Sequence, residues 1–384
     1  MTAGRFELAG WLVLDDRVAL GRVTVEDGWI AAVELDEEGT AAGLSSEGAS
    51  RGADDRPLIA PGFVDLHVHG FGGFDAMGGP DALSGMARAV RAHQVTSFLP
   101  TAVTASLDAL ERFADDVRAW MPHAPEDGAQ PLGFNLEGPF LSEARRGAHD
   151  PALLLAPADV PTSRLDRLAE GLRMITVAPE LPGALDLIAW AVERGVVVSL
   201  GHSAATFAQA QAGYAAGARS TTHLFNAMTG IDHRSPGLAL AALLDDAVAV
   251  ELIADGHHVV PEVWPLITRL KPPDRLFLVS DAIALAGTGA GQGRIGGLPV
   301  EIARGRAVLA GTSTLAGSVV ALDTAVRNLV ASGLPLPHAI AAASRNPLAL
   351  LGISDRGRIA VGQRAALVAF DPQLRVRPEA GAGP

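Results

Sequence analysis

The sequence predicts an α/β protein: a (β/α)8 TIM-like barrel with a small β-sandwich domain built from both chain ends. Three observations support this fold class. Short β-rich segments occupy residues 1–57 and return over residues 353–384. Residues 58–352 alternate between apolar runs and Ala-rich helical stretches. Several of these runs end on His, Asp or Glu, and active-site residues of such barrels lie at the carboxyl ends of the strands.

The N-terminal part of the small domain has the texture of β-hairpins. Strands are expected at 6–14, 17–25 and 29–33, because short apolar segments separated by Asp and Gly turns are typical of hairpins. The Gly-, Ser- and Glu-rich segment 36–56 is expected to be a loose loop.

The central part is expected to form the barrel. Strands that alternate with helices are parallel and joined by crossovers. A length of about 290 residues fits a barrel whose usual size is roughly 250 residues before insertions. The eight runs predicted to be strands are 58–69, 95–103, 131–140, 174–180, 196–203, 219–226, 248–257 and 275–283.

The C-terminal part returns to β texture. Residues 357–362 and 365–371 are expected to form a hairpin that packs with the N-terminal strands, so that the barrel is inserted between two halves of one small domain. Residues 375–384 are expected to be a frayed tail.

Composition and charge exclude several classes of function. A formal net charge of −13 argues against nucleic acid and anionic membranes as partners. No apolar run reaches the roughly 18 residues of a membrane helix, and the N-terminus lacks a signal-peptide core, so a cytoplasmic protein is expected. Because the chain has no cysteine, any metal must take His and carboxylate ligands.

Two histidines close the first predicted barrel strand. His67 and His69 are two residues apart, so their side chains share one face of the strand and point into the barrel. Asp65 shares that face and could support them. A lone His-x-His is weak support for a metal site, but its place at a strand end strengthens it.

Three further polar residues end predicted strands three, five and six: Glu137, His202 and His223. Each alone fits a capping acid or a hydrogen-bonded core histidine. Together they favour a site for zinc or a similar divalent ion, with a position left open for water. Asp281 ends strand eight, where it can act as a general base, although an additional ligand or a structural acid fits its place too.

Other polar residues carry less information by themselves. One of the pair His257 and His258 is placed to face the barrel mouth, and His149 lies in the loop after strand three. Arg234 lies in the loop after strand six and suits phosphate recognition, although such arginines are more often solvated. His93, His123 and His338 lie away from strand ends and are interpreted as structural or surface residues.

Several motifs resemble those of the N-acetylglucosamine-6-phosphate deacetylases of the amidohydrolase superfamily, over nearly the whole chain. The most specific are LEGPFL (136–141), THLFNAM (222–228) and LAGS (315–318). The others are PGFVDLHVHG (61–70), GAH (147–149), LGHS (200–203), ADGHH (254–258) and SDA (280–282).

The resemblance implies a role for each matching residue. Glu137, His202 and His223 match the principal metal ligands, and His67 and His69 match a pair that completes a second metal position in some members. Asp281 matches the catalytic acid/base, and His258 the residue that contacts the acetamido carbonyl. The remaining matches concern the phosphosugar: His149 and Ala148, Asn226 and Ala227 by their backbone, Leu315, and Arg234.

The implied activity is metal-dependent hydrolysis of the acetamide of N-acetyl-D-glucosamine 6-phosphate, in amino-sugar catabolism. Zinc is the leading metal, with Fe²⁺, Mn²⁺ and Co²⁺ as alternatives and one or two ions per subunit. The family's phosphate-binding arginine, here Arg234, reaches the neighbouring subunit of a homodimer. Ser235 replaces the acid that usually follows it, which leaves the loop conformation and the sugar preference open.

Three alternatives remain at this point. The galacto epimer, N-acetylgalactosamine 6-phosphate, fits the sequence as well. Another N-acyl or cyclic-amide hydrolase of the superfamily would commonly carry a bridging lysine near strand four, whereas Lys271 is the sole lysine and lies outside any strand end. A binding protein without activity would have lost ligands, and all of them are present here.

Overall fold

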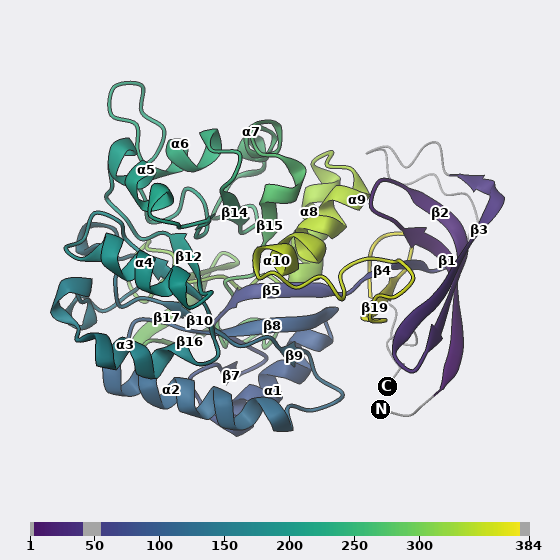
Figure 1. Ribbon diagram of the computed structural model, residues 1–384, viewed down its shortest axis with the longest axis horizontal. Helices are drawn as coiled ribbons and strands as arrows, with labels where there is room; N and C mark the ends of the chain where they lie inside the picture. The colour runs from purple at the N-terminus through teal and green to yellow at the C-terminus, as the bar shows by residue number, and fades with distance from the viewer. Residues whose placement is uncertain (1–3, 41–54, 377–384) are drawn as a thin grey trace.

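The computed structural model describes residues 4–40 and 55–376, and its centre is a parallel barrel (Figure 1). Neighbouring strands follow chain order from β5 to β15. The strands are β5 (Phe63–Val68), β8 (Val95–Ala102), β10 (Phe134–Glu137), β11 (Leu172–Val177), β12 (Val197–Leu200), β13 (Ser220–Thr221), β14 (Ala249–Leu252) and β15 (Leu276–Leu278). Each predicted run contains one of them, except that 174–180 overlaps β11 instead of containing it, so the predicted barrel is confirmed.

Backbone hydrogen bonds bring the first and last strands together. The Asp281 amide donates to the His67 carbonyl at 2.9 Å, and the His69 amide donates to the Ala282 carbonyl at 2.8 Å. These bonds join the end of β5 to the residues that follow β15. Consequently the strand ends that carry polar residues face one another across the barrel mouth.

Helices surround the barrel on the outside (Figure 1). They are α1 (Pro80–Arg91), α2 (Leu107–Trp120), α3 (Thr162–Ala169), α4 (Ala184–Glu193), α5 (Phe207–Ala215), α6 (Leu238–Leu244), α7 (Trp264–Leu270), α8 (Leu322–Ala331), α9 (Leu336–Ala343) and α10 (Arg345–Leu350). Helix α2 shows the common design: the Ser106 side chain caps its first turn, and Leu110, Phe113 and Val117 are buried against the barrel.

A five-stranded sheet beside the barrel contains both ends of the chain, as predicted. Its order is β19-β4-β1-β2-β3, with bounds β1 (Arg5–Val13), β2 (Val18–Glu26), β3 (Trp29–Thr40), β4 (Leu58–Pro61) and β19 (Leu367–Phe370). Figure 1 shows the purple N-terminal strands next to the yellow C-terminal one. Strand β4 is parallel to β1 and antiparallel to β19, so it links the two ends.

The predicted first barrel strand, 58–69, is two strands. The chain changes direction at Gly62, which separates β4 in the small sheet from β5 in the barrel. A Cβ at Gly62 would lie 2.2 Å from Thr96 Cγ2, so only glycine fits this close crossing. A continuous apolar run does not reveal such a division, because both strands are fully buried.

Two predictions about the chain ends are corrected. Residues 36–40 belong to β3 rather than to a loop, while 41–54 of that predicted loop lie outside the described residues. In the predicted hairpin only the second half is a strand. The segment 357–362 forms bends and a turn. Gly362 and the adjacent Gln363 form backbone hydrogen bonds with Ile30 of β3, and the segment does not pair with β19. Of the predicted tail, 377–384 lie outside the described residues.

An antiparallel sheet between β15 and α8 was not predicted. It consists of β16 (Gln292–Ile295), β17 (Leu298–Ala303) and β18 (Arg306–Leu309). Its Ile295 and Val300 pack with Val103 and Ile283 in a separate apolar cluster near the barrel mouth. Short strands β6 (Gly70–Phe71), β7 (Phe74–Asp75) and β9 (Gln130–Pro131) complete the sheets.

Single 3₁₀ turns occupy several loops, namely Met121–His123, Glu143–Arg145, Pro151–Leu153, Pro157–Asp159, Pro261–Val263 and Pro273–Arg275. Within residues 4–40 and 55–376, no helix has both the length and the apolarity needed to cross a membrane.

Candidate metal centre

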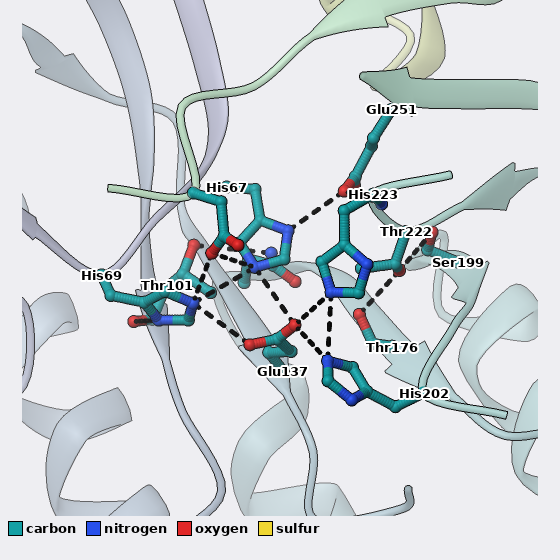
Figure 2. A network of polar contacts seen from close by, with 12 residues as sticks. His67, His69, Thr101, Glu137, Thr176, Ser199, His202, Thr222, His223 and Glu251 are labelled. Atoms are coloured by element: carbon teal, nitrogen blue, oxygen red, sulfur yellow. Dashed lines mark hydrogen bonds and ion pairs between the residues drawn. The ribbon is translucent and has the colours of Figure 1, made fainter. Parts of the chain in front are cut away.

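Glu137 is the centre of a buried polar cluster at the barrel mouth (Figure 2). Its Oε1 lies 3.0 Å from His202 Nε2 and 2.9 Å from His223 Nε2. Its Oε2 lies 3.1 Å from His69 Nε2. His67 Nε2 lies 3.5 Å from Oε1. The residues predicted to hold a metal therefore meet around one carboxylate.

Asp281 borders the same cluster. Its Oδ1 lies 3.2 Å from His69 Nε2 and 3.6 Å from His67 Nε2. His67, His69, Glu137 and Asp281 have ligand atoms within 4.8 Å of one another, as do Glu137, His149 and His202. Glu137 is common to both groups, so the cluster offers two adjacent positions that share one carboxylate.

Three site residues lie in the left-handed region of backbone space. His202, His223 and Asp281 have φ of 44°, 28° and 49°, and each follows the end of a short strand. Non-glycine residues pay for this conformation, and such residues cluster at functional sites. In this conformation the chain turns after each strand, and the side chains of these residues point toward the centre of the barrel mouth.

The outward ring nitrogens of three histidines have acceptors that fix their tautomers. His69 Nδ1 donates to the Thr101 carbonyl at 3.0 Å, and His202 Nδ1 donates to the Arg145 carbonyl at 2.9 Å. His67 Nδ1 lies 3.1 Å from Glu251 Oε2. Neutral rings with Nδ1 protonated present Nε2 lone pairs to the centre of the cluster.

When these rings are neutral, as metal-ligating imidazoles are, their Nε2 lone pairs face one another without a proton between them. His67 Nε2 lies 3.3 Å from His69 Nε2, and His202 Nε2 lies 3.0 Å from His223 Nε2. Glu137 adds carboxylate oxygens to the same space. Such an arrangement of acceptors needs a cation, and imidazole nitrogens with a carboxylate are the ligands that divalent metals of the zinc type prefer. The residues present thus fit a divalent metal.

The electrostatics of the site divide these histidines into two groups. Burial would lower the pKa of His69, but the carboxylates of Asp281 and Glu137 outweigh it and raise the pKa to about 9. His67 responds in the same direction, against burial, through Glu137, Glu251 and Asp281. At His202 burial prevails and lowers the pKa to about 4.

The carboxylates of the cluster respond to the neighbouring rings. Burial would raise the pKa of Glu137, but attraction to His67, His149 and His202 lowers it well below its usual range. The pKa of Asp281 is lowered as well, chiefly by His67, against the effect of burial. Asp281 is therefore a carboxylate able to accept a proton.

A pocket of about 440 Å³ opens above the cluster and contains most of the predicted substrate residues. His258 lines it and is held by Asp255, whose Oδ2 lies 2.7 Å from His258 Nδ1. His149 lines it with Nδ1 2.8 Å from Thr104 Oγ1. The other predicted residues along its wall are Ala148, Asn226, Ala227 and Leu315, with His69, Glu137, His202, His223 and Asp281 at its floor.

Two predicted residues lie outside this pocket wall. His67 is fully buried beneath the floor. Arg234 is exposed, in a turn where Asp232 Oδ1 accepts the amides of Arg234 and Ser235 at 2.8 Å each. His257 is also exposed, so of the two adjacent histidines it is His258 that faces the pocket.

Sequence reasoning missed the residues that support the ligands. Glu251 lies within β14 and contacts His67, and Asp255 orients His258. Glu251 carried a signal, since it is the sole charged residue within the apolar stretch 248–254 of a run predicted to be a strand. Ile295, Ser313 and Thr314 line the pocket from the unpredicted sheet and its loop, and nothing in their local sequence marked them.

Comparisons with known proteins agree with this geometry. The model of the amidohydrolase family matches residues 58–381. The N-acetylgalactosamine-6-phosphate deacetylase of Escherichia coli O157:H7 is 38% identical over 93% of this chain and 95% of its own. The N-acetylglucosamine-6-phosphate deacetylase of Vibrio furnissii is 36% identical over 94% and 91%, respectively.

A solved structure gives the same result. A mutant N-acetyl-D-glucosamine-6-phosphate deacetylase from Mycobacterium smegmatis, in complex with N-acetyl-D-glucosamine-6-phosphate, aligns with a TM-score of 0.85 and 35% identity. The alignment covers 97% of both chains. The similarity thus extends over barrel and small sheet together.

Proposed function

The chain belongs to the amidohydrolase family, and we propose that it hydrolyses the acetamide of N-acetyl-D-glucosamine 6-phosphate to glucosamine 6-phosphate and acetate. The observation that carries this proposal is the convergence of Glu137, His202 and His223 within 2.9–3.0 Å beneath a pocket. Relatives that cover nearly the whole chain carry the same activity in their names.

Glu137, His202 and His223 would hold the principal divalent ion, and His67 and His69 would complete a second position. When bound, the ion supplies Lewis acidity, which activates water and polarises an amide carbonyl. Zinc suits the ligand set best, since neutral imidazoles and a carboxylate leave room for an open coordination position. Fe²⁺, Mn²⁺ and Co²⁺ share this ligand chemistry.

Asp281 is the proton carrier of the proposed reaction. Its carboxylate lines the pocket and its lowered pKa keeps it ionised at neutral pH. It accepts a proton from the attacking water as the C–O bond forms, and returns that proton to the amine as the C–N bond breaks. Acid–base catalysis of this kind contributes about 10²–10⁴-fold to a rate.

His258 is the proposed donor to the acetamido oxygen. Asp255 Oδ2 lies 2.7 Å from its Nδ1 and leaves Nε2 for the substrate, to which Nε2 donates when both ring nitrogens carry a proton. Developing negative charge on the carbonyl oxygen is best stabilised by donors already held in place. His149, Ala148 and Leu315 would contact the sugar from the pocket wall.

Phosphate binding is proposed to involve two elements. The backbone of Asn226 and Ala227 lines the pocket. Arg234 is exposed outside it, which fits a residue that serves the neighbouring site of a cytoplasmic homodimer. Arg234 of the partner subunit would then orient the sugar through its remote phosphate. Arg234→Ala should mainly raise KM, and an unchanged KM would remove this residue from the phosphate site.

The galacto epimer is a second candidate substrate, because one of the most similar relatives is an N-acetylgalactosamine-6-phosphate deacetylase. The decisive experiment compares acetate release from N-acetylglucosamine 6-phosphate, its galacto epimer and unphosphorylated N-acetylglucosamine. The highest kcat/KM is expected for the gluco phosphosugar. A higher value for the galacto epimer would reverse the assignment, and no acetate from either phosphosugar would refute it.

A further inference from the structure

Glu251 is a buried carboxylate without an assigned role. It lies in β14, and its side chain is 0% exposed. A buried carboxylate is costly unless it is paired or hydrogen-bonded. The partners that Glu251 has in the barrel should therefore indicate why a carboxylate is placed at this position.

Glu251 contacts two of the proposed ligand residues, His67 and His223, through a single oxygen. Its Oε2 lies 3.1 Å from His67 Nδ1 and accepts the His223 backbone amide at 2.9 Å. Figure 2 shows Glu251 above His67 and His223, on the side away from Glu137. Oε1 has no hydrogen-bond partner among the described residues. The Glu251 carboxylate thus belongs to neither group of potential ligands, but it contacts His67 at the end of β5 and the backbone of His223 after β13.

These contacts define what the carboxylate does to His67. An acceptor at Nδ1 selects the tautomer with the proton on Nδ1, so the Nε2 lone pair faces His69, Glu137 and Asp281. The negative charge also makes Nε2 a stronger donor to a cation, an effect that carboxylates commonly exert on metal-bound imidazoles. By contrast, His69 and His202 have neutral backbone carbonyls at the same position.

We propose that Glu251 is a positioning residue that orients His67 and sets the affinity of the metal position beside β5. This inference rests on the proposed metal centre but not on the identity of the substrate. A purely structural role would be limited to the His223 amide. Loss of the carboxylate would then weaken both metal positions alike, or neither.

The test measures binding of Co²⁺ alone to the full-length protein after removal of metal, by equilibrium dialysis with elemental analysis and by visible absorption. The wild-type protein is expected to bind two equivalents. Glu251→Leu should weaken one of them about 10–100-fold, the usual cost of losing a partner of a ligating histidine. The other equivalent should keep its affinity.

Glu251→Gln separates charge from hydrogen bonding, because its amide oxygen still accepts both donors. It should weaken the same position by a smaller factor, up to about tenfold. Asp323→Asn is the matched control. Asp323 is another buried carboxylate, and it contacts His93 and Arg327, neither of which is a proposed metal ligand, so both Co²⁺ affinities should stay at the wild-type values.

Three results would overturn the proposal: unchanged affinity at both positions in Glu251→Leu, equal weakening of both, or a single wild-type equivalent that does not respond to either substitution. If Glu251→Leu does not fold, Glu251→Gln decides, and its unchanged binding counts against the proposal. Acetate release is measured separately. If the wild-type protein releases no acetate from either phosphosugar, while Glu251→Leu still weakens Co²⁺ binding at one position alone, the proposed function is refuted and this inference stands.

Discussion

The metal centre has two sides that are held by different kinds of structure. His67 and His69 come from the end of β5, and their outward nitrogens face groups within the barrel, Glu251 and Thr101. His202 and His223 instead follow β12 and β13 in left-handed turns. His202 is held by the carbonyl of Arg145 in an exposed loop, and His223 Nδ1 has no partner among the described residues.

This difference shows two ways in which a barrel can deliver a ligand. Strand pleat alone sets the direction of His67 and His69, since residues two apart share a face. The direction of His202 and His223 depends on strained turns that the surrounding packing must maintain. Glu137 connects the two sides because its two oxygens contact residues of both.

The largest effect is expected at the proposed proton carrier, which lies beside His67 and His69. Asp281→Asn should lower kcat by about 10²–10⁴-fold, because the amide cannot accept the proton of the attacking water. Elemental analysis should find the metal content unchanged, since the principal position is formed by Glu137, His202 and His223. Loss of metal together with activity would instead make Asp281 a ligand rather than the acid/base.

The two sides should respond unequally to loss of one histidine. His223 Nε2 lies 2.9 Å from Glu137 Oε1, whereas His67 Nε2 lies 3.5 Å away. His223→Asn is therefore expected to reduce kcat/KM by more than about 10²-fold, and His67→Asn by roughly tenfold. Steady-state kinetics with metal titration measures both. Equal losses would contradict a division into a principal and an accessory position.

The metal-free protein should show opposite pH responses at His69 and His202, one histidine from each side. The folded-state pKa of His69 is raised to about 9, so its stabilising contribution is complete below about 6.5 and is lost as pH rises toward 9. The pKa of His202 is lowered to about 4, so stability is lost as pH falls from about 6.5 toward 4. Stability should then be greatest near pH 6.5.

Urea unfolding of the metal-stripped protein across pH 4–9 measures this profile. Each limb is expected to amount to about 1–3 kcal/mol. His69→Gln should flatten the alkaline limb and leave the acid limb, while His202→Gln should do the reverse. A profile on which neither substitution acts selectively would show that His69 and His202 titrate as one unit.

The smallest effect concerns the support beneath the turn that carries His223. Thr222 Oγ1 donates to Ser199 Oγ at 2.7 Å and lies 3.0 Å from Thr176 Oγ1. Thr222→Val should destabilise the protein by about 1–2 kcal/mol, because a buried hydroxyl is left without its partner. Metal affinity should fall only a few-fold. Urea unfolding and Co²⁺ titration would show whether this network supports the turn or merely fills the barrel.

The residues that sequence reasoning found are those whose position follows from local pattern. Glu137, His202, His223 and Asp281 each end or follow an apolar run, and His67 and His69 follow the pleat. The barrel could be predicted from the alternation of strands and helices, because each apolar run is long enough to be identified from its own residues. The small sheet was found because both chain ends have the same hairpin texture.

The residues that were missed depend on distant segments. Glu251 acquires its contacts from His67, far away in the sequence, and Asp255 was overlooked beside the histidine it orients. The division of 58–69 at Gly62 arises from a close approach to Thr96. The sheet of β16, β17 and β18 interrupts the barrel as an insertion, so no repeating pattern announces it.

The amino-acid sequence by itself determined the barrel and its order of strands, as well as which residues stand at their carboxyl ends. These features follow from the periodicity of apolar residues and from Gly, Pro and Asp at turns, both of which are properties of short segments. The tertiary structure alone decided that Glu137 is shared by two adjacent groups of potential metal ligands, and that Glu251 contacts His67 in one of them. Such distances are set by closure of the barrel, which brings together side chains that no local pattern relates.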